Sequence, residues 1–252
     1  MKPTTERVPS FDRQELAVHR LGHGRPVLLL HGLFSNARTN WIKFGHARRL
    51  ADAGFEAIMP DLRAHGASAA PHDPAAYPAG VLVKDAVALA EALGLTDFDL
   101  VGFSLGSRTA AAAVIAGLRP RRLVLAGMGL EGLTGSELRS GFFIDAIDRF
   151  EEVRHGDPAF LAVSFMKTMK IDRVAARLLL QAVSEVDVAD LARIDMPAAV
   201  ICGDKDTDNG SPQALVDALP DARYIEVPGT HMSSVTEPEM GQAIVDFLSK
   251  QT

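Results

Sequence analysis

The sequence lacks the features of disulfide-stapled and membrane-spanning proteins. Its 252 residues include one cysteine, Cys202, which cannot form an intramolecular disulfide. We expect Cys202 to be a small buried apolar side chain. No run of 18 apolar residues occurs, and the polar segment 1–14 has no apolar signal core. We therefore expect a soluble, cytoplasmic protein with no membrane partner.

An excess of basic charge is also missing. The net charge is −6, with acidic and basic residues interspersed, so nucleic acid is not expected as a partner. Cys-x-x-Cys spacing does not occur, and Gly22-His23-Gly24 is too short for a dinucleotide fingerprint. We expect no metal and no cofactor, and the oligomeric state stays open.

What is present is a hydrophobic content of 47%, enough for a sizeable core in one domain, with or without an insertion. Strand-like segments occur at 17–21, 27–30, 57–59, 99–101, 122–126, 199–202 and 224–227. Helix-like segments alternate with them at 47–53, 79–93, 107–117, 212–219 and 237–250. This alternation predicts an α/β fold with a mostly parallel, doubly wound sheet, in which the less apolar segment 17–21 is an edge strand.

The sequence Gly102-Phe103-Ser104-Leu105-Gly106 joins an apolar strand to an alanine-rich helix. A serine presented on so sharp a turn needs a strained backbone with positive φ and small neighbours two residues away, which the two glycines supply. The pattern is typical of a nucleophile elbow, and it predicts that Ser104 is a nucleophile whose neighbour Leu105 offers its backbone N–H to an oxyanion.

Two further groups follow in order along the chain. Asp204 and Asp206 lie just after the strand 199–202, where open α/β sheets place their sites. His231 follows the last predicted strand. The order serine, acid, histidine distinguishes this arrangement from the two protease orders. The residues alone leave the choice between Asp204 and Asp206 open.

With these motifs, and with His31-Gly32-Leu33-Phe34 after the apolar run 26–30, the chain resembles the α/β-hydrolase family from about Phe11 to about Leu248. The segment 55–68 is similar to the family's strand and Asp-Gly-Gly-Ser loop, although Ala64 stands where a glycine is usual. The resemblance implies the α/β-hydrolase fold.

The resemblance also implies several roles. Asp206 would be the acid and Asp204 a brace of the turn, while the N–H groups of Leu33 and Leu105 would form the oxyanion hole. His31 is interpreted as a hydrogen-bonded structural histidine, and His65 and Asp61 as residues that shape their loop.

Between Met128 and Asp195 the pattern is helical only. We expect a helical cap, 129–195, inserted into a core of 1–128 and 196–252. Its apolar side chains predict a small or medium, largely apolar substrate. The candidate pocket residues are Phe34, Phe143, Ile147, Phe165, Met166 and Met232.

The sequence thus predicts a serine hydrolase of small-molecule carboxylic esters that acts through Ser104, Asp206 and His231 and an acyl-enzyme. The same triad would serve a hydrolase of C–C bonds, thioesters, lactones or amides. A ligand-binding or receptor member of the fold is the alternative from another class.

Overall fold

A single sheet organises the molecule. The computed structural model describes residues 2–183 and 185–250, apart from the side chains of 136–138. Within these residues the sheet has eight strands in the order β1-β2-β4-β3-β5-β6-β7-β8. The strands are β1 (Thr4–Pro9), β2 (Glu15–Gly22), β3 (Arg25–Leu30), β4 (Phe55–Pro60), β5 (Asp99–Phe103), β6 (Leu123–Ala126), β7 (Ala198–Gly203) and β8 (Ala222–Val227).

The sheet is mostly parallel, as expected, because β4, β3, β5, β6, β7 and β8 pair in parallel while β1 and β2 pair antiparallel. The expectation that the strand near 17–21 forms an edge is wrong. β1, which the sequence pattern did not predict, pairs with the outer side of β2 from Thr4↔Arg20 to Pro9↔Glu15. That pairing allows Ala17 and Val18 to be fully buried.

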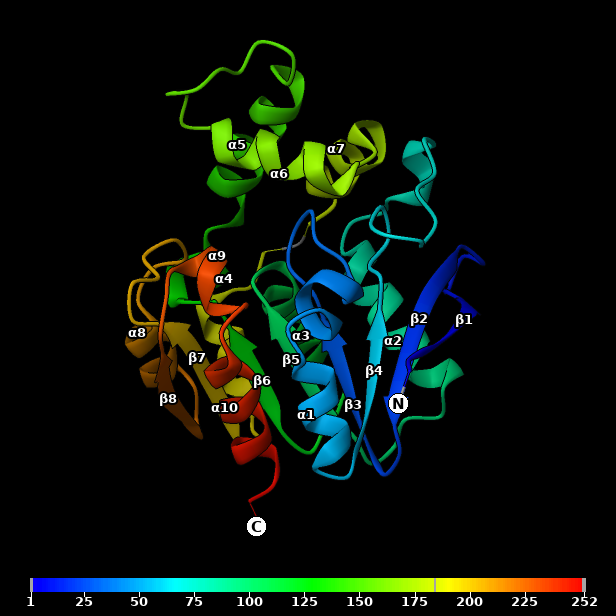
Figure 1. Cartoon of the computed structure of the whole chain (residues 1–252), viewed down its shortest axis with the longest axis vertical. Coiled ribbons are helices and arrows are strands. Elements are labelled where there is room, and N and C mark those ends of the chain that lie inside the picture. The colour runs from blue at the N-terminus through cyan, green and yellow to red at the C-terminus, as the bar shows by residue number, and fades with distance from the viewer. Residues whose placement is uncertain (1, 184, 251–252) are drawn as a thin grey trace.

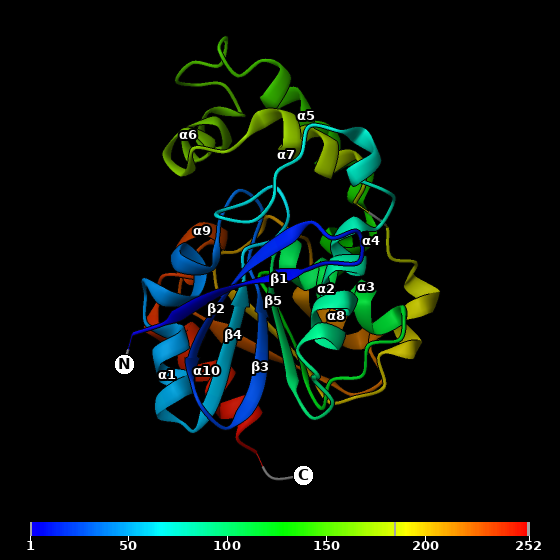
Figure 2. The ribbon, with the colours of Figure 1, turned by 90° about the vertical axis from the view of Figure 1, so that its right-hand side faces the viewer.

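Helices cover both faces of the sheet (Figure 2). The helices of the body are α1 (His46–Asp52), α2 (Val81–Ala92), α3 (Leu105–Ile115), α8 (Pro212–Ala218), α9 (His231–Ser234) and α10 (Pro238–Leu248), with short helices η1 (Arg38–Ile42) and η2 (Pro74–Ala76). α1 and α10 pack on one face, and α2, α3 and α8 pack on the other. The predicted α/β-hydrolase architecture is confirmed. No helix among the described residues is long and apolar enough to cross a membrane.

The segment between β6 and β7 contains only helices in its described residues, namely α4 (Leu130–Thr134), α5 (Ser136–Asp148), α6 (Phe160–Met169), α7 (Arg173–Gln181) and η3 (Val188–Arg193). α4 and η3 pack against α3 and α8 of the body. α5, α6 and α7 form a layer above the carboxyl ends of the strands (Figure 1), which we call the helical lobe. The lobe is tied to the body by the hydrogen bond from Gly80 N to Ala182 O, at 2.8 Å.

The loop after β4 is held by a buried cation. Arg63 is fully buried, and its guanidinium bonds to the carboxylates of Asp12 at 2.6 Å and Asp85 at 2.7 Å. It also donates to Ala76 O at 2.7 Å. One side chain therefore joins the hairpin before β2, the β4 loop and α2.

Replacing Arg63 should destabilise the fold strongly, since removal of one partner leaves Asp85 buried without its cation. We expect Arg63→Ala to lower the free energy of unfolding by about 3–5 kcal/mol, measured by urea denaturation. The matched control is Arg48→Ala, whose exposed pair with Asp52 at 2.8 Å should contribute less than about 1 kcal/mol. Equal urea midpoints for the two variants would contradict the structural role of Arg63.

Candidate functional site

The turn between β5 and α3 presents Ser104 in a strained conformation. Ser104 has φ 54° and ψ −114°, a region that side-chain-bearing residues avoid. Its backbone N–H donates to Ala126 O at 2.9 Å, and its carbonyl accepts from Arg108 N at 3.1 Å. Helix α3 begins at the very next residue, Leu105, two residues earlier than the sequence pattern predicted.

The two glycines around Ser104 are required by close packing. A Cβ on Gly106 would lie 2.0 Å from Leu30 O, and one on Gly102 would lie 2.3 Å from Gly106 O. Both contacts are with backbone atoms that cannot rotate away. The first turn of α3 therefore lies directly on the end of β3.

Three side chains that are far apart in sequence meet at the carboxyl ends of β5, β7 and β8. Nε2 of His231 lies 3.0 Å from Ser104 Oγ, and Nδ1 lies 3.0 Å from Asp206 Oδ2. The side chains of His231 and Asp206 are 9% and 2% exposed, whereas Ser104 is half-buried. The carboxylate selects the tautomer with the proton on Nδ1, which leaves Nε2 free to accept a proton from Ser104.

Of the two candidate acids, the structure brings Asp206 to His231. Burial alone would raise the pKa of Asp206, but the hydrogen bond and charge of His231 and the N–H of Asp208 hold it below its usual value. Asp204 instead accepts from Gly229 N at 2.7 Å. It thus braces the loop that carries His231, as the resemblance implied.

The ring of His231 is held on two sides. It stacks on Phe103, with ring centroids 5.2 Å apart and planes at 28°. A Cβ on Gly127 would lie 2.8 Å from Phe103 Cε2 and 3.2 Å from His231 Cε1, so this glycine lets both rings pack closely against the end of β6. Thr230 and Ser233 form a capping box that starts α9 at His231.

The loop after β3 lies against Ser104. A Cβ on Gly32 would be 3.5 Å from Ser104 Cβ, and Gly32 N donates to the buried amide of Asn40 at 3.1 Å. In the described part of the chain, the N–H groups of Leu33 and Leu105 have no hydrogen-bond acceptor. Two backbone donors are thus unpaired at the positions expected for an oxyanion hole.

Three polar residues that we interpreted as structural from the sequence form hydrogen bonds to backbone N–H groups of the loops. His31 is fully buried and accepts from Leu62 N at 2.9 Å, which confirms it as a structural histidine. Burial lowers the pKa of His65 to about 3, so the neutral ring accepts from Phe34 N at 3.0 Å. Asp61 accepts from Ala37 N and Ala67 N, both at 2.8 Å, and so joins the β3 and β4 loops.

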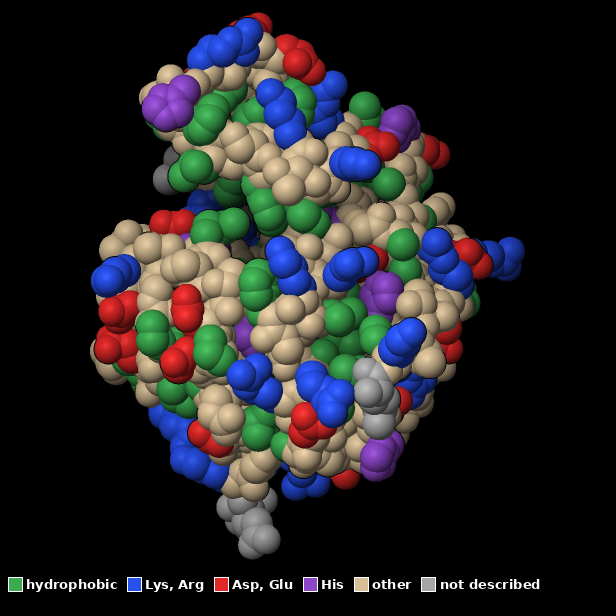
Figure 3. All heavy atoms as spheres, viewed as in Figure 1, with side chains coloured by type: hydrophobic (Ala, Val, Ile, Leu, Met, Phe, Trp, Pro, Cys, Tyr) green, Lys and Arg blue, Asp and Glu red, His purple; other side chains and the backbone are tan. Residues whose placement is uncertain are grey.

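Five of the six candidate pocket residues belong to one apolar cluster, formed by the helical lobe and the β3 loop: Phe34, Phe143, Ile147, Phe165 and Met166. Phe34 contacts Phe143 edge to face at 5.5 Å, which joins the β3 loop to α5. Met232 lies outside this cluster and is 53% exposed. Figure 3 shows a hollow between lobe and body with hydrophobic side chains on both sides.

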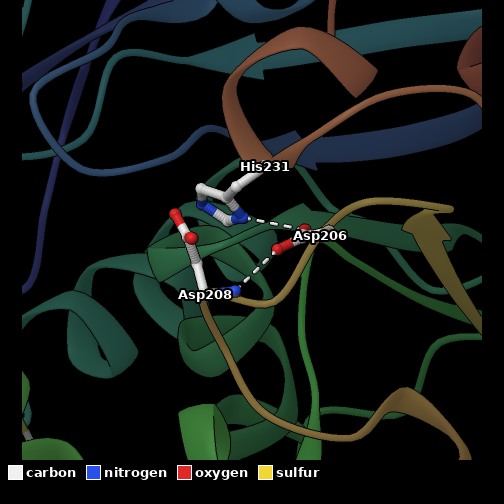
Figure 4. Close-up of side chains that lie close together, drawn as sticks. All are labelled: Asp206, Asp208 and His231. Atoms are coloured by element: carbon white, nitrogen blue, oxygen red, sulfur yellow. Dashed lines mark hydrogen bonds and ion pairs between the residues drawn. The ribbon is translucent and has the colours of Figure 1, made fainter.

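A second carboxylate lies beside the triad. Asp206, Asp208 and His231 each offer a ligand atom within 4.8 Å of the others, and Figure 4 shows Asp208 directed toward the ring. These three could hold a divalent cation. A cation on Nδ1 would displace the proton given to Asp206, so metal binding there would compete with the Ser104–His231–Asp206 chain.

The sequence analysis missed two buried amides. Asn40 fixes the β3 loop through Gly32, and Asn209 lies beside His231 in the β7–α8 loop. Neither belongs to a motif. The only local sign was the glycines at 127, 129 and 132, which leave space that Asn209 and His231 partly fill.

Comparison with known proteins indicates the family and the fold. Residues 25–150 match a family model described as alpha/beta hydrolase fold. The chain is 28% identical over 246 residues to pyrrolizixenacetamide deacetylase of Xenorhabdus hominickii, covering 86% of this chain and 88% of that protein. It is 32% identical over 146 residues to an epoxide hydrolase of Caballeronia sordidicola, covering 55% of this chain and 43% of that one.

Solved structures show the same fold at low identity. A thermophilic esterase from Thermogutta terrifontis superposes with a TM-score of 0.76 and 24% identity, covering 97% of this chain and 98% of that one. A likeness at this identity supports the arrangement of the sheet and helices alone.

Substitution by alanine should have opposite effects on stability at Gly106, which is tightly packed, and at Gly141, which is not. Gly106→Ala should lower the free energy of unfolding by more than about 2 kcal/mol, because the new methyl group meets the β3 backbone. Gly141→Ala in α5 meets nothing within 4 Å and should raise it by about 0.5–1 kcal/mol. Urea denaturation of both variants measures this, and a stabilising Gly106→Ala would contradict the close crossing.

Proposed function

Since the chain belongs to the alpha/beta hydrolase fold family, we propose that it is a serine hydrolase that cleaves a small or medium, largely apolar carboxylic ester through an acyl-enzyme. The observation that carries the proposal is the continuous hydrogen-bond chain from Ser104 through His231 to Asp206, with both links at 3.0 Å. A protein that only binds its ligand has no chemical need for this chain.

In the proposed mechanism, His231 takes the proton of Ser104 as its Oγ attacks the ester carbonyl. Asp206 stabilises the imidazolium that forms. The oxyanion accepts hydrogen bonds from the N–H groups of Leu33 and Leu105, which need no reorganisation because they have no acceptor among the described residues. His231 then protonates the leaving alcohol, and a water activated by the same ring hydrolyses the acyl-enzyme.

Epoxide opening is disfavoured by the nucleophile, although one relative bears an epoxide hydrolase name. Epoxide hydrolases of this family attack with a carboxylate at the elbow and pass through an alkyl ester on it. Ser104 occupies that position here, and its bond to His231 suits acyl transfer.

Amide hydrolysis is the second candidate, because the relative aligned along 88% of its own length is named a deacetylase of an acetamide. The same triad serves both bonds, but the amide requires His231 to protonate an amine as it leaves. C–C bonds, thioesters and lactones are further substrates for the same nucleophile.

We propose that the helical lobe acts as a cap over this site. The segment 129–195 would be the insertion, and the apolar cluster around Phe34 and Phe143 would contact the acyl or alcohol part of the substrate. The segment 129–195 is a modest cap of 67 residues, which favours a small or medium substrate rather than a polymer.

The first test is modification of Ser104 by a fluorophosphonate, measured by intact mass and peptide mapping. We expect one adduct on Ser104 and none on Ser104→Ala. A folded wild-type protein that forms no adduct would overturn the proposal and favour a binding protein.

Matched acetate esters and acetamides then compare hydrolysis of the two bonds. We expect kcat/KM to be higher for the esters.

The two acids of the β7 loop make a matched pair. Asp206→Asn should lower kcat by about 10²–10⁴-fold, because the amide no longer selects the reactive tautomer of His231. Asp204→Asn keeps an acceptor for Gly229 N and should change kcat by less than about threefold. Steady-state kinetics on the best ester measures both, and equal losses would reject the assignment of Asp206.

A further inference from the structure

Resting on the proposed function, we infer that Asn209 is a positioning residue for the reaction. Its buried amide anchors the loop that carries Asp206 to the end of β6, and at the same time it contacts Nδ1 of His231. Asn209 touches no reacting atom, so it acts through the histidine.

Gly129 and Gly132, at the start of α4, form a socket for Asn209 on one side. A Cβ on Gly132 would lie 2.5 Å from Asn209 Cβ, and one on Gly129 would lie 2.6 Å from Asn209 O. Gly132 N donates to Asn209 O at 2.8 Å. The start of α4 therefore packs closely against Asn209 and restricts the position of the Asn209 side chain.

The orientation of the amide follows from its partner. Nδ2 lies 2.8 Å from the carbonyl oxygen of Gly127, which can only accept, so the nitrogen and not the oxygen faces Gly127. The same nitrogen lies 3.4 Å from His231 Nδ1. Because Gly127 also borders the ring at Cε1, one amide fixes the backbone and the imidazole beside it.

Nδ1 of His231 is held from two sides. Its N–H donates to Asp206 Oδ2 at 3.0 Å, and the amide nitrogen of Asn209 lies 3.4 Å from the same ring nitrogen. Both nitrogens carry protons, so the amide limits the position of the ring by contact rather than by a hydrogen bond. Asn209 therefore helps to keep the ring aligned between Asp206 and Ser104.

The test is Asn209→Leu, which retains the size of the side chain and removes its N–H groups. At optimal pH we expect kcat per fluorophosphonate-titrated site to fall about 10–100-fold, with KM unchanged within about threefold. This split between kcat and KM distinguishes a misaligned histidine from a general loss of folded enzyme, which the titration of sites already removes. Asn209→Ser is the second variant, and its kcat per titrated site should also fall while KM stays unchanged.

Ser211→Ala is the matched control in the same loop. Its hydroxyl caps α8 through Ala214 N at 3.1 Å, so its loss should lower the urea midpoint of unfolding while kcat per titrated site stays at the wild-type value. Reduced stability of Asn209→Leu with wild-type kcat per titrated site would mean a structural role alone and would overturn the inference. If the wild-type protein gives no adduct on Ser104, the proposed function fails. If it does and the Asn209 variants match it, only this inference fails.

Discussion

The crossing of α3 over the end of β3 is the constraint on which the site depends. Two helix and strand backbones approach so closely that a methyl group on Gly106 would lie 2.0 Å from Leu30 O. Ser104, at the start of α3, has a strained conformation, and the β3 loop lies against it, since a Cβ on Gly32 would be 3.5 Å from Ser104 Cβ. The proposed nucleophile and the loop of the proposed oxyanion hole therefore meet at this crossing.

Around this crossing, buried polar groups hold the loops that the strands alone leave free. Asp61 and the neutral rings of His31 and His65 join the β3 and β4 loops through backbone N–H groups. Asp204 performs the same task for the loop of His231. Each of these groups has a partner, as buried polar groups require, so the loops are as well defined as the sheet on which they stand.

Strand order explains why residues separated by more than a hundred positions meet. β5 and β7 lie on either side of β6, and β8 lies beside β7, so Ser104, Asp206 and His231 emerge at one edge of the sheet. The helical lobe covers that same edge (Figure 1). In the proposed function, chemistry and substrate contacts would thus come from different parts of the chain, and the lobe could vary without disturbing the proposed triad.

Local pattern was sufficient wherever the physical requirement is local. Apolar runs and glycine spacing determined the parallel strands, the longer body helices and the turn at Ser104, because burial and positive φ restrict residue types directly. Tertiary structure alone decided the rest. β1 is polar and forms because β2 offers it a partner. Asp206 rather than Asp204 faces His231 because Gly229 engages the other carboxylate. Asn209 belongs to no motif, since its place depends on a socket built by residues about 80 positions earlier.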